Sequence, residues 1–179
     1  MHVVGIDLSL TATGIAHAYT GGTTVDTITS KGTADATLPA RAARLDRLTT
    51  TILDNLGDAQ LVVLESPSLG QARQGGQLDR HGLWWLVAHA LHRRGYPTAT
   101  VTPAGRAKYA TGKGNAPKDA VLLAVARRYP TVEVVNNNEA DALVLAAMGT
   151  RHLGHPIDDM PLTHTAALDA AHWPTQEQP

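Results

Sequence analysis

Three acidic residues stand where regular elements of this sequence are expected to begin or end. Asp7 closes the first predicted strand, Glu65 closes the fourth, and Asp141 lies in the first turn of the last predicted helix. Ligands of α/β sheets collect at the carboxyl ends of the strands, and carboxylates gathered there repel one another unless a cation lies between them. Oxygen ligands favour Mg²⁺ or Mn²⁺, and two such ions can activate water and stabilise the leaving 3′ oxygen in phosphodiester hydrolysis. The three carboxylates therefore indicate a metal-dependent nuclease.

Each carboxylate taken alone has an ordinary structural explanation. Asp7 can cap a turn, Glu65 can pair with a core arginine, and Asp141 can offset the positive N-terminal end of its helix. Their common placement is what favours a joint site. Glu65 also follows the apolar run 61–64, where a carboxylate needs a partner or a metal because burying its charge alone is costly.

Basic residues gather in one part of the chain, although the net charge of −1 argues neither for nor against nucleic acid. Residues 93–128 carry eight arginines and lysines against one acidic residue. Lys118 stands at a predicted helix N-terminus after the loop 112–117, a position suited to gripping a phosphate and stabilising its developing charge. Contacts to the DNA backbone are predicted for Arg73, Arg106, Lys108 and Lys113. The alternative explanation of this stretch is an exposed, solvated face.

The hydrophobic pattern predicts a run of strands followed by alternating strands and helices. Strands are expected at 2–6, 14–19, 23–30, 60–64 and 96–102, with an edge strand at 132–135. Helices are expected at 39–56, 78–94, 105–110, 118–129 and 139–152. This order predicts an α/β fold with a mixed five-stranded sheet flanked by helices.

A single domain is expected from 179 residues with an apolar fraction of 43%. We place it at 1–153 and expect the proline-containing segment 154–179 to be a loosely ordered or docked tail. The absence of cysteine excludes disulfides and thiolate metal sites. Neither an export signal nor an apolar stretch of about 20 residues is present, so we expect no membrane association and a cytoplasmic location.

Four segments resemble motifs of the RuvC family of Holliday-junction resolvases. Residues 5–16 (GIDLSLTATGIA) resemble the opening strand–turn–strand with its metal-binding aspartate, and Leu64-Glu65 resembles the second acidic position. Residues 102–118 are similar to a family segment with a proline, a lysine, a glycine-bearing loop and a second lysine, and 139–143 (EADAL) to its terminal helix motif. The resemblance spans about 3–150. It implies a ribonuclease H-like fold, a catalytic metal site and four-way branched DNA as the substrate.

Two departures from the family pattern lie near the predicted metal site. One helical turn before Asp141, where the family commonly has another acidic residue or a histidine, this sequence has Asn138, whose amide oxygen can still ligate a metal. Glu139 is the alternative, but in a regular helix it projects about 160° away from Asp141. After Glu65, where some resolvases place an aromatic residue that stacks at the junction opening, the segment 66–69 offers only Leu69.

Other functions compete with this interpretation. A sugar kinase or actin-like ATPase shares the opening strand–turn–strand but needs a duplicated domain, usually over about 300 residues. A non-catalytic module that binds DNA structures would be marked by a lost carboxylate, and all three carboxylates are present. A ribonuclease H acting on RNA–DNA hybrids, or a less structure-selective nuclease, stays open because no aromatic residue follows Glu65.

A symmetric homodimer is expected if the substrate is a four-way junction. Resolution then needs two nicks related by a two-fold axis, and one small domain offers a single site. The helix at 78–94 carries apolar residues that wrap too widely for one stripe: Leu83, Trp84, Leu86, Val87, Ala90 and Leu91. Either this helix is buried centrally or one of its faces binds the partner.

Overall fold

The computed structural model describes residues 1–67 and 76–175, in which five strands form one mixed sheet with the order β3-β2-β1-β4-β5. The strands are β1 (His2–Asp7), β2 (Ala12–Tyr19), β3 (Gly22–Thr29), β4 (Leu61–Glu65) and β5 (Thr98–Val101). β1 is antiparallel to β2 and parallel to β4, which is parallel to β5. The predicted mixed sheet of five strands is confirmed.

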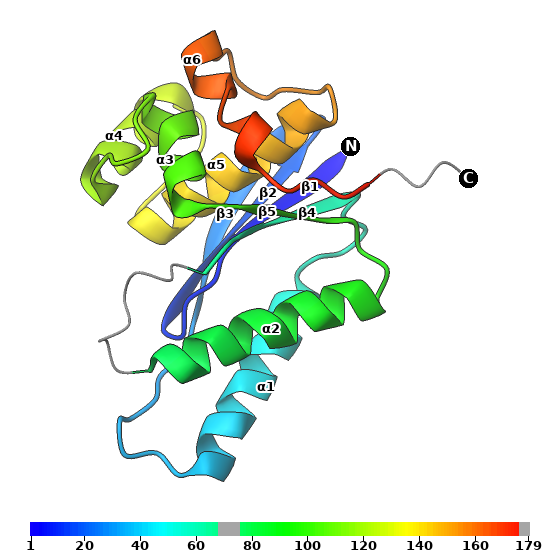
Figure 1. Cartoon of the computed structure of the whole chain (residues 1–179), viewed down its shortest axis with the longest axis vertical. Coiled ribbons are helices and arrows are strands. Elements are labelled where there is room, and N and C mark those ends of the chain that lie inside the picture. The colour runs from blue at the N-terminus through cyan, green and yellow to red at the C-terminus, as the bar shows by residue number, and fades with distance from the viewer. Residues whose placement is uncertain (68–75, 176–179) are drawn as a thin grey trace.

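Helices cover both faces of this sheet. They are α1 (Leu38–Asp54), α2 (Gln77–Arg93), α3 (Pro103–Thr111), α4 (Lys118–Arg128), α5 (Asn137–His152) and α6 (Leu162–Thr165). Figure 1 shows α1 and α2 on one side of the sheet and α3, α4, α5 and α6 on the other, and each layer has its own apolar cluster against the strands. Within the described residues, no helix is long and apolar enough to cross a membrane.

Helix α5 lies at the centre of its layer. All residues from 139 to 150 are buried, because one side of the helix packs on β1 and β2 and the other on α3 and α4. The segment tolerates burial all round because it is built mainly of alanine, leucine, valine and other small or apolar residues. The position of α5 therefore decides where the side chains of its first turns lie.

Two glycines in the sheet allow α5 to approach closely. A Cβ atom built on Gly5 would lie 2.2 Å from the carbonyl oxygen of Ala142, and one built on Gly14 would lie 2.0 Å from the carbonyl oxygen of Asn138. Both distances are far below van der Waals contact, so any side chain at these positions would push the helix away. Gly14 thereby sets how closely the N-terminal turn of α5 lies against the sheet.

The predicted edge strand at 132–135 is wrong. The segment has no regular secondary structure, and the Val135 N–H group donates a 2.9 Å hydrogen bond to the Glu139 carboxylate instead of to a neighbouring strand. Val132 and Val134 still pack against the core. The apolar pattern that predicted a strand therefore reflects burial of these side chains and not strand pairing. The backbone N–H group that a strand would pair is bound by the first turn of α5.

Residues 154–175 are docked along the α3–α5 layer. Asp158 accepts hydrogen bonds from the hydroxyl groups of Tyr109 and Tyr129, which belong to α3 and to the end of α4. His172 exchanges two backbone hydrogen bonds of 2.9 Å with Thr100, so this segment also covers the outer edge of β5. An exposed strand edge invites pairing with other chains, and this contact protects it.

Gly14→Ala is expected to destabilise the fold by about 1–3 kcal/mol or more, the range for overpacked positions. The added methyl group meets backbone atoms of Asn138, which cannot rotate away as a side chain can. Urea unfolding of the two proteins measures the difference. Gly21→Ala is the matched control, since nothing lies within 4 Å of a Cβ atom there. Equal stability of the two variants would contradict the close approach of α5.

Candidate active site

Strand pairing brings Asp7 and Glu65 together. β1 and β4 are parallel neighbours with Ile6 opposite Leu64, so both strands end at the same edge of the sheet. Ile6 and Leu64 pack in the cluster with α1 and α2. Because side chains alternate along a strand, the next residue of each strand, Asp7 and Glu65, faces the opposite side, where α5 lies.

The first turn of α5 is fixed by a reciprocal cap. The Asn136 side-chain oxygen accepts a 2.9 Å hydrogen bond from the Glu139 N–H group, and its Nδ2 group donates one of 2.9 Å back to the Glu139 carboxylate. That carboxylate also accepts a 2.7 Å hydrogen bond from the Thr27 hydroxyl group. Glu139 is thus engaged with β3 and the cap. Asn138 and Asp141, three residues apart on the helix, line a cavity instead. Of the two candidates beside Asp141, the structure places Asn138 at the cavity.

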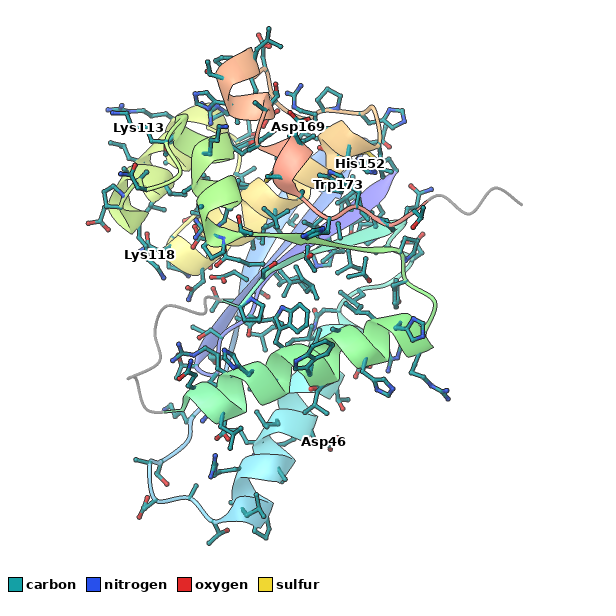
Figure 2. The ribbon with its side chains drawn as sticks, in the orientation of Figure 1. Asp46, Lys113, Lys118, His152, Asp169 and Trp173 are labelled. Carbon is teal, nitrogen blue, oxygen red and sulfur yellow. The ribbon has the colours of Figure 1, made fainter. Side chains whose placement is uncertain are left out.

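A cavity of about 450 Å³ joins the predicted residues at this edge of the sheet. Its polar lining includes the three carboxylates together with Asn138 and Lys118, and further Ser9, Arg44, Arg80, His81 and Arg106. Lys108 and Lys113 do not line it, and Arg73 lies outside the described residues. Figure 2 shows Lys113 and Lys118 on the same side of the molecule, where α3 and α4 meet. Of the three lysines predicted to contact DNA, Lys118 is therefore the one that lies in the cavity with the carboxylates.

Arg106 does not lie on the surface, where we predicted it to contact DNA. α3 starts directly after β5, capped by the Thr102 hydroxyl group, and its first turn points Arg106 inward. The side chain donates hydrogen bonds from Nε to Glu65 and from Nη1 to Asp141, and the residue is 6% exposed. A contact with DNA would require the guanidinium to leave both carboxylates, so this structure does not support the predicted role.

Repulsion and burial act most strongly on Asp7. Burial, followed by the charges of Glu65 and Asp141, raises the pKa of Asp7 to about 8, although Arg106 and Lys118 act in the opposite direction. Burial likewise raises the pKa of Asp141 to about 6, although Arg106 counteracts it. The two cationic side chains therefore do not compensate the negative charge that the three carboxylates would carry together at neutral pH.

The ligand atoms of this site are oxygens, the type that hard divalent cations prefer. The site offers three carboxylates and the amide oxygen of Asn138, and a dication removes the repulsion that raises the pKa of Asp7. Across residues 1–67 and 76–175, however, no group of three or more histidine, cysteine, aspartate or glutamate side chains is arranged to hold a metal ion. Two of the carboxylates are instead joined by Arg106. The residues fit Mg²⁺ or Mn²⁺ chemically, while Arg106 pairs with two of them here.

Trp84 is a site residue that the sequence analysis missed. It lines the cavity from α2, and its indole N–H group donates a 2.9 Å hydrogen bond to the carbonyl oxygen of Glu65. It thus fixes the end of β4 and provides an aromatic surface beside Glu65. Periodicity and composition do not indicate this role, because Trp84 follows the buried Leu83 in an apolar helix and fits a core position equally well.

The fold is shared with solved structures of Thermus thermophilus RuvC. One of them, alone, aligns with 89% of this chain and 100% of its own at 19% identity and a TM-score of 0.65. Another, in complex with a Holliday junction substrate, aligns with 89% of this chain and 99% of its own at 17% identity and a TM-score of 0.65. No protein-family model and no curated protein matches the chain. The likeness confirms the predicted ribonuclease H-like fold.

Asp7→Asn is expected to stabilise the protein in the presence of a chelator. The pKa of Asp7 is raised to about 8 from the ordinary aspartate value of 3.8, so ionisation of this carboxyl group destabilises the fold progressively as pH rises through that interval. The variant should therefore gain more in Tm at about pH 8 than at about pH 5, by several degrees, because ~1 kcal/mol shifts Tm by ~2–4 °C in a chain of this size.

Thermal unfolding in EDTA at the two pH values measures this gain. Asp46→Asn is the control, because Asp46 is exposed on α1 in the other helical layer (Figure 2). An Asp7→Asn variant no more stable than the wild type at the higher pH would show that Asp7 is not held beside the other two carboxylates.

Proposed function

We propose that the chain is a metal-dependent endonuclease that hydrolyses phosphodiester bonds in branched DNA, with the four-way Holliday junction as its preferred substrate. The observation that carries this proposal is the convergence of Asp7, Glu65 and Asp141 in one cavity with Asn138 and Lys118. The substrate shape is supported by the fold, which the chain shares with a RuvC solved in complex with a Holliday junction substrate.

The carboxylates and Asn138 would hold Mg²⁺ or Mn²⁺. When bound, a pair of such ions polarises the scissile phosphate, favours ionisation of the attacking water and stabilises the leaving 3′ oxygen. The protein's own part is to fix the oxygen donors: the ends of β1 and β4 hold Asp7 and Glu65, and the capped start of α5 holds Asn138 and Asp141. Trp84 restrains the backbone of Glu65 through its hydrogen bond.

Lys118 is proposed to grip the scissile phosphate. It is the exposed first residue of α4, lines the cavity, and lies near enough to Asp7 and Asp141 to lower the pKa of both. The N-cap residue Pro117 makes no side-chain hydrogen bond to the helix, so the first N–H groups of α4 are not capped by it and can bind phosphate oxygens. Charge and backbone dipoles then act together on the negative charge that develops during cleavage.

Contacts to the DNA backbone are also proposed for Lys108, Lys113 and Arg73. Lys113 is exposed in the loop between α3 and α4 on the side of Lys118 (Figure 2), and Lys108 is half-buried on α3. Such contacts supply affinity that falls with salt and carry little information about sequence.

Asp7→Asn, Glu65→Gln and Asp141→Asn are each expected to abolish Mg²⁺- or Mn²⁺-dependent cleavage and to leave junction binding intact. Each substitution removes charge that holds the metal without touching the proposed DNA contacts. Cleavage of a labelled four-way junction measures the first effect and a gel-shift titration the second, with Asp46→Asn as the control. Near-normal cleavage by a folded variant would exclude that residue from the site.

The same cleavage assay, run on different DNA substrates, tests which of them the protein prefers. The wild type should cut a four-way junction faster than a linear duplex, a flap or an RNA–DNA hybrid. A preference for the hybrid would favour a ribonuclease H, and junction binding without cleavage of any substrate would favour a non-catalytic module.

Lys118→Ala is expected to lower the cleavage rate by about 10²-fold or more, the scale of lost transition-state charge stabilisation, with a much smaller loss of affinity. Lys113→Ala should mainly weaken binding. Single-turnover cleavage and binding titrations separate the two effects. Equal losses of binding and rate at both positions would make Lys118 a general phosphate contact.

A homodimer is proposed through one face of α2. Leu83, Val87 and Leu91 of this helix are buried against the sheet layer, whereas Leu78 and Trp85 are 78% and 68% exposed. These two residues are seven positions apart, so they share one exposed face of the helix. A second copy that covers this apolar face would bring two cavities into one assembly, which two nicks in one junction require.

Trp85→Glu is expected to convert the dimer into a monomer, because a charge replaces a large apolar side chain at the proposed interface. Sedimentation velocity measures the assembly. Leu162→Glu on α6 is the control, since Leu162 is 86% exposed and lies in the other layer. A wild type that sediments as a monomer both free and bound to a junction, with cleavage intact, would overturn the dimer.

A further inference from the structure

Arg106 lies inside the carboxylate cluster, in a place that the proposed function does not explain. Its side chain is 7% exposed, and its two partners, Asp141 and Glu65, have side chains that are 2% and 15% exposed. Its Nε and Nη1 atoms donate to one oxygen of each carboxylate, so one guanidinium bridges the end of β4 and the second turn of α5. The same two carboxylates belong to the proposed metal-binding set.

A guanidinium and a divalent cation cannot both occupy this position at low energetic cost. Each is positive, and at a separation of a few Å in a partly buried site their repulsion exceeds the thermal energy several-fold. A metal ion also needs the carboxylate lone pairs that the N–H groups of Arg106 use. Arg106 lines the same cavity as the carboxylates, so its side chain has adjoining space into which it can turn.

We infer that Arg106 is a built-in counter-cation, which holds Glu65 and Asp141 together in the metal-free protein and is displaced when a divalent cation binds. The inference rests on the proposed function, because it takes these carboxylates as metal ligands. It gives Arg106 two opposite effects: the residue stabilises the metal-free fold and weakens metal binding. A residue that only supported the metal site would strengthen binding instead.

Calorimetric titration with Mn²⁺ in the absence of DNA tests this inference. Arg106→Gln should bind Mn²⁺ at least about tenfold more tightly than the wild type, because the ion no longer displaces a guanidinium. Its Tm in EDTA should fall by several degrees, since two buried carboxylates lose their partner. Arg80→Gln is the matched control: Arg80 lines the same cavity and has no ion pair among the described residues, so its loss should change the affinity by less than about twofold.

Arg106→Lys keeps the positive charge and provides a second variant if Arg106→Gln does not fold. A single ammonium cannot reproduce the two-nitrogen bridge, so its Mn²⁺ affinity should lie above that of the wild type. Adding Asp7→Asn to either Arg106 variant should remove the gain in Mn²⁺ affinity, which places the bound ion at this site.

In the wild type, the ¹⁵N-resolved Nε–H signal of Arg106 should be protected from exchange without metal and lose that protection when Mg²⁺ saturates the site.

The outcomes separate this inference from the proposed function. Unchanged or weaker Mn²⁺ binding in the Arg106 variants, beside a wild type that binds, would overturn the inference and leave the proposed metal site standing. An Arg106 signal that stays protected at saturating Mg²⁺ would do the same. Absence of Mn²⁺ binding in the wild type and in every Arg106 variant would overturn both.

Discussion

Three carboxylates share one buried edge of the sheet, and the electrostatic cost of holding them there is the constraint on which the site depends. Burial and mutual repulsion raise the pKa of Asp7 to about 8, and Arg106 and Lys118 offset this only in part. A group of like charges persists in a fold when something binds it or when function requires it. The site is therefore built to accept positive charge, and Arg106 supplies some of it within the chain.

The backbone holds these charges in place through a few close contacts. Gly5 and Gly14 let α5 lie directly on β1 and β2, and the cap formed by Asn136 and Glu139 fixes where the helix begins. The close approach of α5 and the position of its cap together place Asp141 beside Asp7. The central helix is thus at once the most deeply buried element of its layer and the one that carries two of the site residues, which ties the stability of the fold to the geometry of the cavity.

The sequence predicted the sheet, the helices and the residues that converge because those features follow local patterns. Apolar alternation and periodicity locate β1, β4 and α5, and parallel pairing then brings Asp7 and Glu65 to one edge. The orientation of Arg106 could not be predicted in this way, since a lysine- and arginine-rich stretch gives no sign of which cation turns inward. The same holds for Trp84, whose bond to Glu65 joins residues 19 positions apart on different elements.

The wrong prediction of a strand at 132–135 and the unpredicted contacts of the segment 154–175 have a similar explanation. Val132 and Val134 are apolar because they pack on the core, but the N–H group of Val135 finds the Glu139 carboxylate rather than a strand. The docking of 154–175 uses Asp158, whose buried side chain meets two tyrosines from other elements, and the backbone pair of His172 with Thr100. Contacts between distant segments decide both cases, and composition alone does not contain them.

The central claim is that the carboxylate cluster is one cation-binding site with Arg106 as its resident counter-charge. Anomalous diffraction from crystals soaked in Mn²⁺ tests it most directly. We predict an anomalous peak in the cavity that the three carboxylates line, with the Arg106 guanidinium turned away from Glu65 and Asp141. Crystals at saturating Mn²⁺ with no peak in the cavity and with Arg106 still paired to both carboxylates would contradict the claim.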